Sequence, residues 1–257
     1  MSVPEAPVTH GHERGAPLTF SRIVIIGGGC YGSWYAQQLT RAAQRGALLA
    51  SDVVVVDRDP ACRVAALNDA GQYDGLPLRV EVAEWDAYLA DWLGQGPAAL
   101  ASDAMVPSPL MPHVCLDWLI ARARARWPER RIRVEPLDQA PPTPWERASP
   151  DGRHYVSYAT WMCPVNCIEP ARCPHTRGVR DWSMPPMMRQ FVHDNPALLG
   201  PVIFHCVHRT YGVGMIDAAA IADADRQLAA WGASGPCAVL VGTVSHCHGA
   251  LGVLAVD

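Results

Sequence analysis

The sequence has 257 residues, a net charge of −4 and only 18% charged residues. This charge gives no basic surface for nucleic acid or anionic lipid, so we expect neither as a partner. All 21 basic residues are arginines. Enzymes that need a lysine are therefore excluded: pyridoxal phosphate enzymes, lysine aldolases, P-loop NTPases and short-chain dehydrogenases with a Tyr-x-x-x-Lys pair. Nine cysteines without an export signal favour the reducing cytoplasm.

Strand and helix patterns alternate through the first half of the chain. Residues 1–18, rich in Pro, Gly and His, predict a flexible tail. Short apolar runs predict strands at residues 23–26, 53–56, 78–82, 104–106 and 131–134. Helical patterns are predicted at residues 31–45, 62–69, 86–93 and 113–127. The alternation indicates an α/β fold with a doubly wound, mostly parallel sheet.

The pattern changes near residue 137 and divides the rest of the chain. Residues 19–136 form one predicted domain, residues 137–200 a Cys- and Pro-rich irregular insertion, and residues 201–257 a C-terminal α/β continuation of the sheet. In this last part we predict strands at residues 202–207, 238–241 and 251–256 and a helix at 216–231.

The C-terminal stretch 236–256 contains no Asp, Glu, Lys or Arg and is long enough to span a bilayer. Its centre is polar, however, with Ser245, His246 and His248. We therefore predict two buried strands joined by a polar turn, and no membrane partner.

The stretch GGGCYG joins the first predicted strand to the first predicted helix. Gly27, Gly29 and Gly32 have the spacing G-x-G-x-x-G, which allows a tight turn, close approach of a pyrophosphate and close helix packing. The positive helix end would then face the phosphates. The second strand ends at Asp57, whose carboxylate would bind ribose hydroxyls and repel a 2′-phosphate. We predict NAD as the cofactor, with NADP as an alternative because Arg58 follows.

Residues 22–60 resemble the Rossmann NAD(P)-binding superfamily, including the TrkA-N type of NAD-binding domain. The resemblance implies a Rossmann-type sheet and a dinucleotide, but no particular reaction. The residues expected at the cofactor come from the loop and from the end of the second strand: Gly27, Gly28, Gly29, Cys30, Tyr31, Gly32, Asp57 and Arg58. FAD, S-adenosylmethionine and a turn without any cofactor are the alternatives.

Three cysteines lie close together in the predicted insertion. Cys163, Cys167 and Cys173 are spaced C-x3-C-x5-C, and His175 follows. Grouped thiolates on an irregular loop suit zinc or an iron–sulfur cluster, so we predict these four residues as metal ligands. The spacing matches neither zinc ribbons nor the common ferredoxin pattern. Free thiols or a redox-sensing disulfide are therefore alternatives.

Histidines also follow predicted strands, where the ligands of open α/β sheets collect. His246 and His248 would face one side of a strand and form an acid–base pair or share a metal. His113 and Cys115 follow the fourth predicted strand and are further catalytic candidates. The alternative for each histidine is a hydrogen-bonded structural role.

These patterns predict an NAD(H)-binding oxidoreductase with a cysteine-ligated metal or iron–sulfur site. It would act on an unknown small molecule or a redox partner protein. The alternative is a non-catalytic NAD- or redox-sensing module, whose cysteines form a structural zinc site or a redox switch. An enzyme of another class, such as a methyltransferase or ligase-type nucleotide enzyme, is a third hypothesis.

Overall fold

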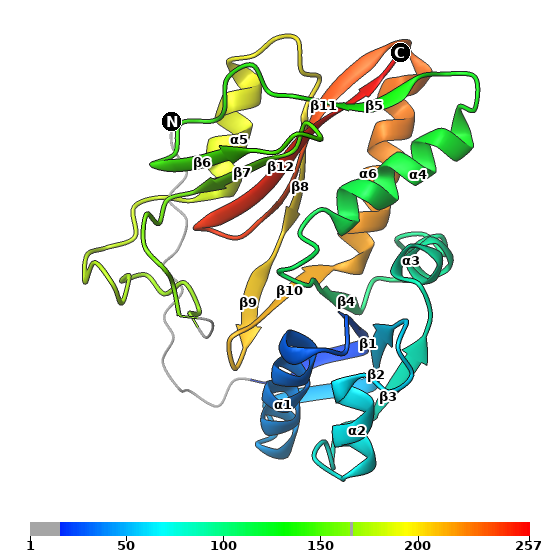
Figure 1. The fold of residues 1–257 in the computed structure, drawn as a ribbon, viewed down its shortest axis with the longest axis vertical. Helices are drawn as coiled ribbons and strands as arrows, with labels where there is room; N and C mark the ends of the chain where they lie inside the picture. Colours follow the sequence, from blue (N-terminus) through cyan, green and yellow to red (C-terminus); the bar gives the residue numbers. More distant parts are fainter. Residues whose placement is uncertain (1–15, 165–166) are drawn as a thin grey trace.

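The computed structural model contains two mixed β-sheets and describes residues 16–164 and 167–257 (Figure 1). The first fifteen residues of the predicted tail lie outside these ranges. Sheet A has the order β3 (Leu78–Val82), β2 (Leu48–Asp57), β1 (Leu18–Ile26), β4 (Asp103–Val106), β10 (Val213–Asp217), β9 (Val207–Thr210). Sheet B has the order β6 (Trp145–Ala148), β7 (His154–Ser157), β12 (His248–Val256), β11 (Cys237–Val244), β8 (Pro201–His205), and β5 (Ile132–Glu135) also pairs with β12.

The predicted doubly wound, mostly parallel Rossmann-type sheet is wrong for this chain. Strands β3, β2, β1 and β4 are parallel, as the strand–helix alternation predicts. However, β10 runs antiparallel to β4 and β9, and β12 runs antiparallel to β11, β5 and β7. An apolar run indicates a buried strand but not its direction. Short turns set the antiparallel direction of β9–β10, through Tyr211–Gly212 where both residues have positive φ, and of β11–β12. The antiparallel pairs β10–β4, β12–β5 and β12–β7 join segments that are far apart in the sequence.

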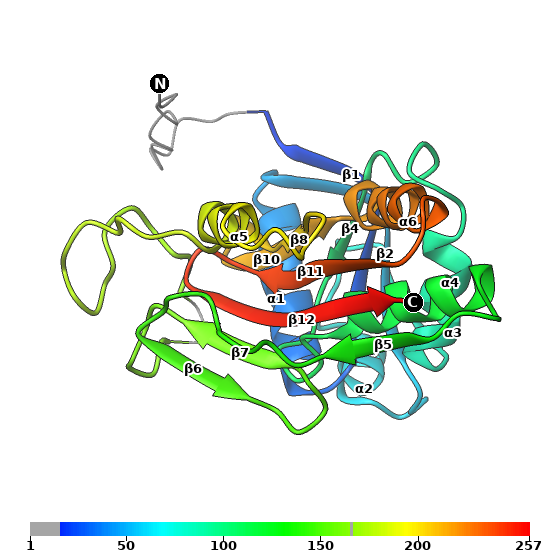
Figure 2. The ribbon, with the colours of Figure 1, turned by 90° about the horizontal axis from the view of Figure 1, so that it is seen from above.

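Helices cover both faces of each sheet. Helices α1 (Cys30–Gln44) and α2 (Arg63–Asp69) pack on one face of sheet A. Helices α3 (Trp85–Leu93), α4 (Val114–Arg126) and α6 (Ala218–Ala233) share an apolar core with both sheets, so α4 and α6 lie between the sheets (Figure 1). Helix α5 (Met184–His193) covers the other face of sheet B. Figure 2 shows β6, β7, β12 and β11 side by side in sheet B.

The core between the sheets combines close packing with a partly buried ion cluster. A Cβ atom on Gly252 of β12 would lie 2.8 Å from the Leu116 side chain of α4, so glycine lets this helix approach the sheet. The buried carboxylate of Asp225 on α6 accepts hydrogen bonds from Arg122 and Arg126 of α4. These contacts fix α4, whose amino end lies next to the site described below.

Two predictions about the second half of the chain have different outcomes. The prediction of two strands joined by a turn in residues 236–256 is confirmed, because β11 and β12 form a hairpin. None of the helices within the described ranges has the length and hydropathy that a membrane crossing requires. The segment 137–200 is less irregular than predicted, because it contains β6, β7 and α5.

Candidate active site

A cavity of about 960 Å³ lies on the face of sheet B that α4 and α6 cover, beyond the amino end of α4. It is lined by helix α1, the loop between β4 and α4, the β6–β7 hairpin, the loop between β7 and α5, the segment from Cys206 into β10, and the β11–β12 hairpin. Five of the nine cysteines of the chain line this cavity: Cys163, Cys167, Cys173, Cys206 and Cys247. The cavity therefore brings together residues that are far apart in the sequence.

The glycine loop lies at the start of α1, as predicted. Gly27 has φ +87°, which side chains rarely adopt, and a Cβ atom on Gly32 would lie 1.9 Å from the Gly27 carbonyl oxygen. Gly29 begins the helix without any side-chain cap, and no acidic residue occupies the first turn. Apart from its chain neighbours and the helix backbone, no atom of the described residues would lie within 4 Å of a Cβ on Gly29. The loop is therefore closely packed at Gly32 and open at Gly29, with uncapped N–H groups at the amino end of the helix.

Asp57 supports this loop through its carboxylate. Its Oδ2 atom accepts a hydrogen bond from the Gly28 N–H at 2.6 Å, and its Oδ1 atom accepts one from the Asp59 N–H at 2.9 Å. Asp57 is partly exposed, and each oxygen keeps a second lone pair for a ligand. Arg58 and Cys30 are exposed beside the loop. The contact between Asp57 and a ribose stays a prediction.

Glu169 anchors the cysteine-containing loop to the turn between β11 and β12. Its buried carboxylate accepts hydrogen bonds from Ser245 Oγ at 2.6 Å, from the His246 N–H at 2.8 Å and from the Cys247 N–H at 3.2 Å. Glu169 itself has φ 49°, in the left-handed region. Such a conformation costs about 1 kcal/mol or more and persists only where surrounding contacts fix it. The three hydrogen bonds supply that constraint.

The charge of Glu169 also acts on its surroundings. Burial raises its pKa, but the hydrogen bond from Ser245, the nearby His208, the hydrogen bond from the His246 N–H, and His248 lower it further, so the net pKa lies below its usual value. Glu169 is therefore a carboxylate at neutral pH.

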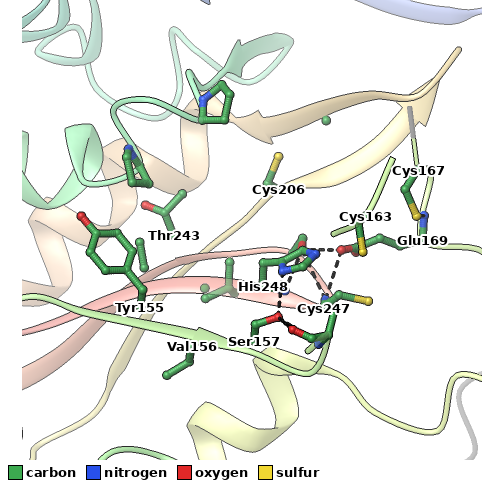
Figure 3. Close-up of a pocket in the computed structure, with 18 of the residues that line it drawn as sticks. Tyr155, Val156, Ser157, Cys163, Cys167, Glu169, Cys206, Thr243, Cys247 and His248 are labelled. Atoms are coloured by element: carbon green, nitrogen blue, oxygen red, sulfur yellow. Dashed lines mark hydrogen bonds between the residues drawn. The ribbon is translucent and has the colours of Figure 1, made fainter. Parts of the chain in front are cut away.

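His248 lies in the centre of the labelled side chains, with Ser157 next to it and Glu169 nearby (Figure 3). Its Nδ1 atom lies 3.0 Å from Ser157 Oγ. The same hydroxyl donates to the Ala159 carbonyl at 2.8 Å and accepts the Ala159 N–H at 2.9 Å. Because a serine hydroxyl has one hydrogen and a carbonyl can only accept, this network places the proton of neutral His248 on Nδ1. Its Nε2 atom is then an unprotonated base.

Two imidazoles thus lie close to the Glu169 carboxylate. The surrounding protein lowers the pKa of His248 and of His208 by excluding water, and the carboxylate partly offsets this effect in both. The charge of His248 lowers the pKa of His208 further. Both imidazoles are therefore mainly neutral at pH 7.

The predicted metal ligands are only partly brought together. Cys163, Cys167 and Cys173 line the cavity, whereas His175 is exposed and stacks on Trp161 with 4.5 Å between ring centroids. Within residues 16–164 and 167–257, no group of three or more His, Cys, Asp or Glu side chains is arranged to hold a metal ion. The metal site therefore stays a prediction.

The thiols of the cavity differ in their environments. Burial, together with Cys167 and Cys173, raises the pKa of Cys163. Backbone N–H groups of Thr176 and His175 hydrogen-bond to the Cys173 sulfur and lower its pKa. Burial raises the pKa values of Cys206 and Cys247 to about 12.

The other predicted catalytic residues do not line the cavity. His113 is buried, its ring meets Tyr155 edge-on at 5.2 Å, and burial lowers its pKa to about 4. Cys115 is buried in the core between α4 and sheet B, which raises its pKa. His246 hydrogen-bonds through Nδ1 to Ser183 Oγ at 2.8 Å. His246 lies in the turn before β12, so the alternation of a strand does not place it beside His248.

Residues 115–257 match the family model AF_1314_C, which is described as "Uncharacterized protein, C-terminal domain". The match covers more than half of the chain. The chain belongs to this family. Neither the curated proteins nor the solved structures gave a match. The AF_1314_C region runs from the first turn of α4 to the end of the sequence, so it contains all of sheet B and every cysteine of the cavity. The glycine loop precedes it.

Two of the residues described above were not predicted from the sequence. Glu169 and Ser157 contribute the carboxylate and the hydroxyl of the site. One sequence signal points to Glu169, because it is the single acidic residue between positions 152 and 180. Nothing in the sequence distinguishes Ser157 from other serines, because its role depends on strand pairing with β12.

Proposed function

We propose that this protein is an NAD(H)-dependent oxidoreductase that holds its dinucleotide at the glycine loop and reacts with a small substrate in the cavity. The observation that carries the proposal is the position of helix α1. This helix begins at the glycine loop, and its Tyr31 and Tyr35 side chains line the same cavity as Cys163, Cys206 and His248. A dinucleotide with its phosphates at the loop would extend along this helix toward those groups.

The chemistry of the loop supports a bound pyrophosphate. The N–H groups of the first turn of α1 lack a side-chain cap, and the helix dipole favours an anion at this end. Gly29 leaves room for phosphate oxygens. The Asp57 carboxylate would accept hydrogen bonds from the ribose hydroxyl groups and would repel the 2′-phosphate of NADP. We therefore expect tighter binding of NADH than of NADPH.

His248 supports a proton transfer coupled to hydride transfer. In the oxidation of an alcohol, the carbon–hydrogen bond breaks and the hydride passes to NAD⁺, which becomes NADH. The hydroxyl proton passes to a base as the carbonyl forms. Neutral His248 has an unprotonated Nε2 atom and is fixed by Ser157, so it can accept this proton.

The proposal is tested by titrating the protein with NADH and following the fluorescence of the reduced nicotinamide. Gly29→Asp places a carboxylate where the phosphates would lie, and we expect it to weaken NADH binding at least tenfold. Gln37→Asp adds the same charge to an exposed position of the same helix and is the matched control. Less than a twofold change is expected there. Absence of NADH and NADPH binding to the wild-type protein would overturn the proposal.

A redox-sensing module is the second candidate, favoured by Cys173. Its partly exposed sulfur accepts backbone hydrogen bonds that stabilise the thiolate, and it shares the cavity with two further thiols of the same loop. This candidate predicts a reversible change in free thiols without consumption of NADH. Turnover of NADH with any small substrate would exclude it.

A further inference from the structure

We propose that Arg147 and Tyr155 form a subsite that holds an anionic oxygen group, a carboxylate or a phosphate, of the substrate. The identification of the bound anion as a substrate rests on the proposed function. Binding of the anion itself does not, because it can be tested without a dinucleotide. It identifies the ligand class as a small organic anion with an apolar body.

The two side chains lie on one face of sheet B. Arg147 of β6 is directly opposite Tyr155 of β7, and Tyr155 is directly opposite Ala250 of β12. Directly opposite residues of antiparallel strands have Cβ atoms about 4.5–5.5 Å apart and point to the same side. All three residues line the cavity. The guanidinium and the phenol can therefore reach the same ligand atom.

The Arg147 guanidinium and the Tyr155 hydroxyl are both available to a ligand, since neither hydrogen-bonds to a described residue. Among the described residues, three side chains with a permanent charge line the cavity, namely Arg147, Glu169 and Arg180. The Glu169 carboxylate accepts hydrogen bonds from the turn before β12. Arg180 donates hydrogen bonds to the carbonyls of Pro170 and Trp182. Arg147 has no hydrogen bond or ion pair with any described residue, and the Tyr155 hydroxyl has no hydrogen bond with one.

An unpartnered guanidinium beside a phenol is suited to an anion. Arginine presents a planar set of N–H donors that matches the two oxygens of a carboxylate or phosphate. The Tyr155 hydroxyl adds one further donor. Arg147 is exposed to the cavity and to solvent, so a ligand can reach it without displacing another residue.

The remaining surface of the cavity is suited to an apolar body. Aromatic side chains from three parts of the chain line it, including Tyr35, Trp145, Trp161 and Trp182. Trp145 lies two residues from Arg147 on the same face of β6, and 43% of it is exposed. An aromatic or similarly apolar ligand with one anionic group would contact both surfaces.

The subsite is at a useful distance from His248. His248 is directly opposite Ser157, which lies two residues from Tyr155 along β7. Arg147 and His248 are therefore about 10 Å apart across the sheet and about 7 Å apart along it, measured between backbones. A small organic anion held by Arg147 can place a second group beside His248.

The experiment uses the full-length protein without dinucleotide and follows tryptophan fluorescence during titration with benzoate, phenyl phosphate and the uncharged analogue benzamide. We expect at least one of the two anions to bind at least tenfold more tightly than benzamide. Arg147→Gln should reduce this preference to less than threefold, and Tyr155→Phe should reduce it partly. Arg189→Gln, at an exposed arginine of α5 outside this cavity, is the matched control and should leave the preference unchanged.

Three outcomes would overturn the proposal. They are equal binding of the anions and benzamide to the wild type, no binding of either anion, and an unchanged preference in Arg147→Gln. Thermal denaturation should show equal midpoints for Arg147→Gln and the wild type, because Arg147 loses no hydrogen bond or ion pair with a residue that the structure describes. NADH titration of Arg147→Gln separates the two proposals: unchanged NADH affinity with lost anion preference supports the subsite. A lost NADH affinity with an unchanged anion preference would assign Arg147 to the cofactor instead.

Discussion

Glu169→Gln should destabilise the protein, although it changes only one atom of the side chain. The Glu169 carboxylate accepts one hydrogen bond on Oε2, from the His246 N–H, and two on Oε1, from Ser245 Oγ and the Cys247 N–H. A glutamine amide has only one oxygen. If that oxygen keeps the two donors on the Oε1 side, the new NH₂ group faces the His246 N–H.

The expected cost follows from these contacts. A buried donor without a partner costs about 1–3 kcal/mol, and hydrogen bonds to a charged group contribute about 1.5–3 kcal/mol each. We therefore expect Glu169→Gln to lower the free energy of unfolding by about 2–4 kcal/mol at pH 7. Glu146→Gln on the exposed strand β6 is the matched control, with a change below about 0.5 kcal/mol expected.

The assay is urea denaturation at a series of pH values. The folded-state pKa of Glu169 lies below its unfolded value, so its carboxylate stabilises the fold at all pH values above the unfolded pKa of about 4.3. This contribution is lost as the pH falls through the folded-state pKa. The difference between wild type and Glu169→Gln should therefore be largest near pH 7 and shrink below pH 4. Equal stabilities of Glu169→Gln and Glu146→Gln at pH 7 would refute the reasoning.

The remaining predictions concern the glycine loop and the thiols. Gly32→Ala should destabilise the protein by at least about 3 kcal/mol, the upper end for overpacking, because its Cβ would lie 1.9 Å from a backbone oxygen. Gly29→Ala should change the free energy of unfolding by less than about 1 kcal/mol, since that position is open. Urea denaturation measures the stability of both glycine variants, and equal effects would contradict the loop geometry. Iodoacetamide at pH 7 should alkylate Cys173 at least about 100-fold faster than Cys206 and Cys247, because its pKa is lowered and theirs are raised to about 12. Peptide mass spectrometry measures these rates, and equal rates would exclude the proposed environments.

The first half of the fold was predictable from the sequence, and the arrangement of the second half was not. The strands predicted at residues 23–26, 53–56 and 78–82 lie within β1, β2 and β3, because strand–helix–strand units are formed by neighbouring segments. The strand predicted at 131–134 exists as β5, but it belongs to sheet B and pairs with β12. Its apolar pattern indicates that the strand is buried but not which strand it pairs with. The partner, β12, lies more than 100 residues later in the sequence.

The candidate site shows the same limit. The glycine loop and the three cysteines were recognisable because their residue types and spacing are local features. Ser157 and Arg147 were not, because a serine and an arginine acquire a function only when pairing with β12 or β7 turns them toward the cavity. The prediction of a metal at the cysteines is tested by zinc and iron analysis of protein purified without oxygen. A stoichiometric amount would require the thiols to move together from their present positions.

The hydrogen bond between Glu169 and Ser245 has a consequence for the protein during translation. These residues are 76 positions apart, so a ribosome that adds 5–20 residues per second needs roughly 4–15 s to supply the second partner after the first. During that interval the loop with Cys163, Cys167 and Cys173 has neither its anchor nor the strand that completes its cavity. Premature oxidation or capture of a foreign metal by these thiols is thus a hazard of synthesis, and it ends when β12 joins its sheet.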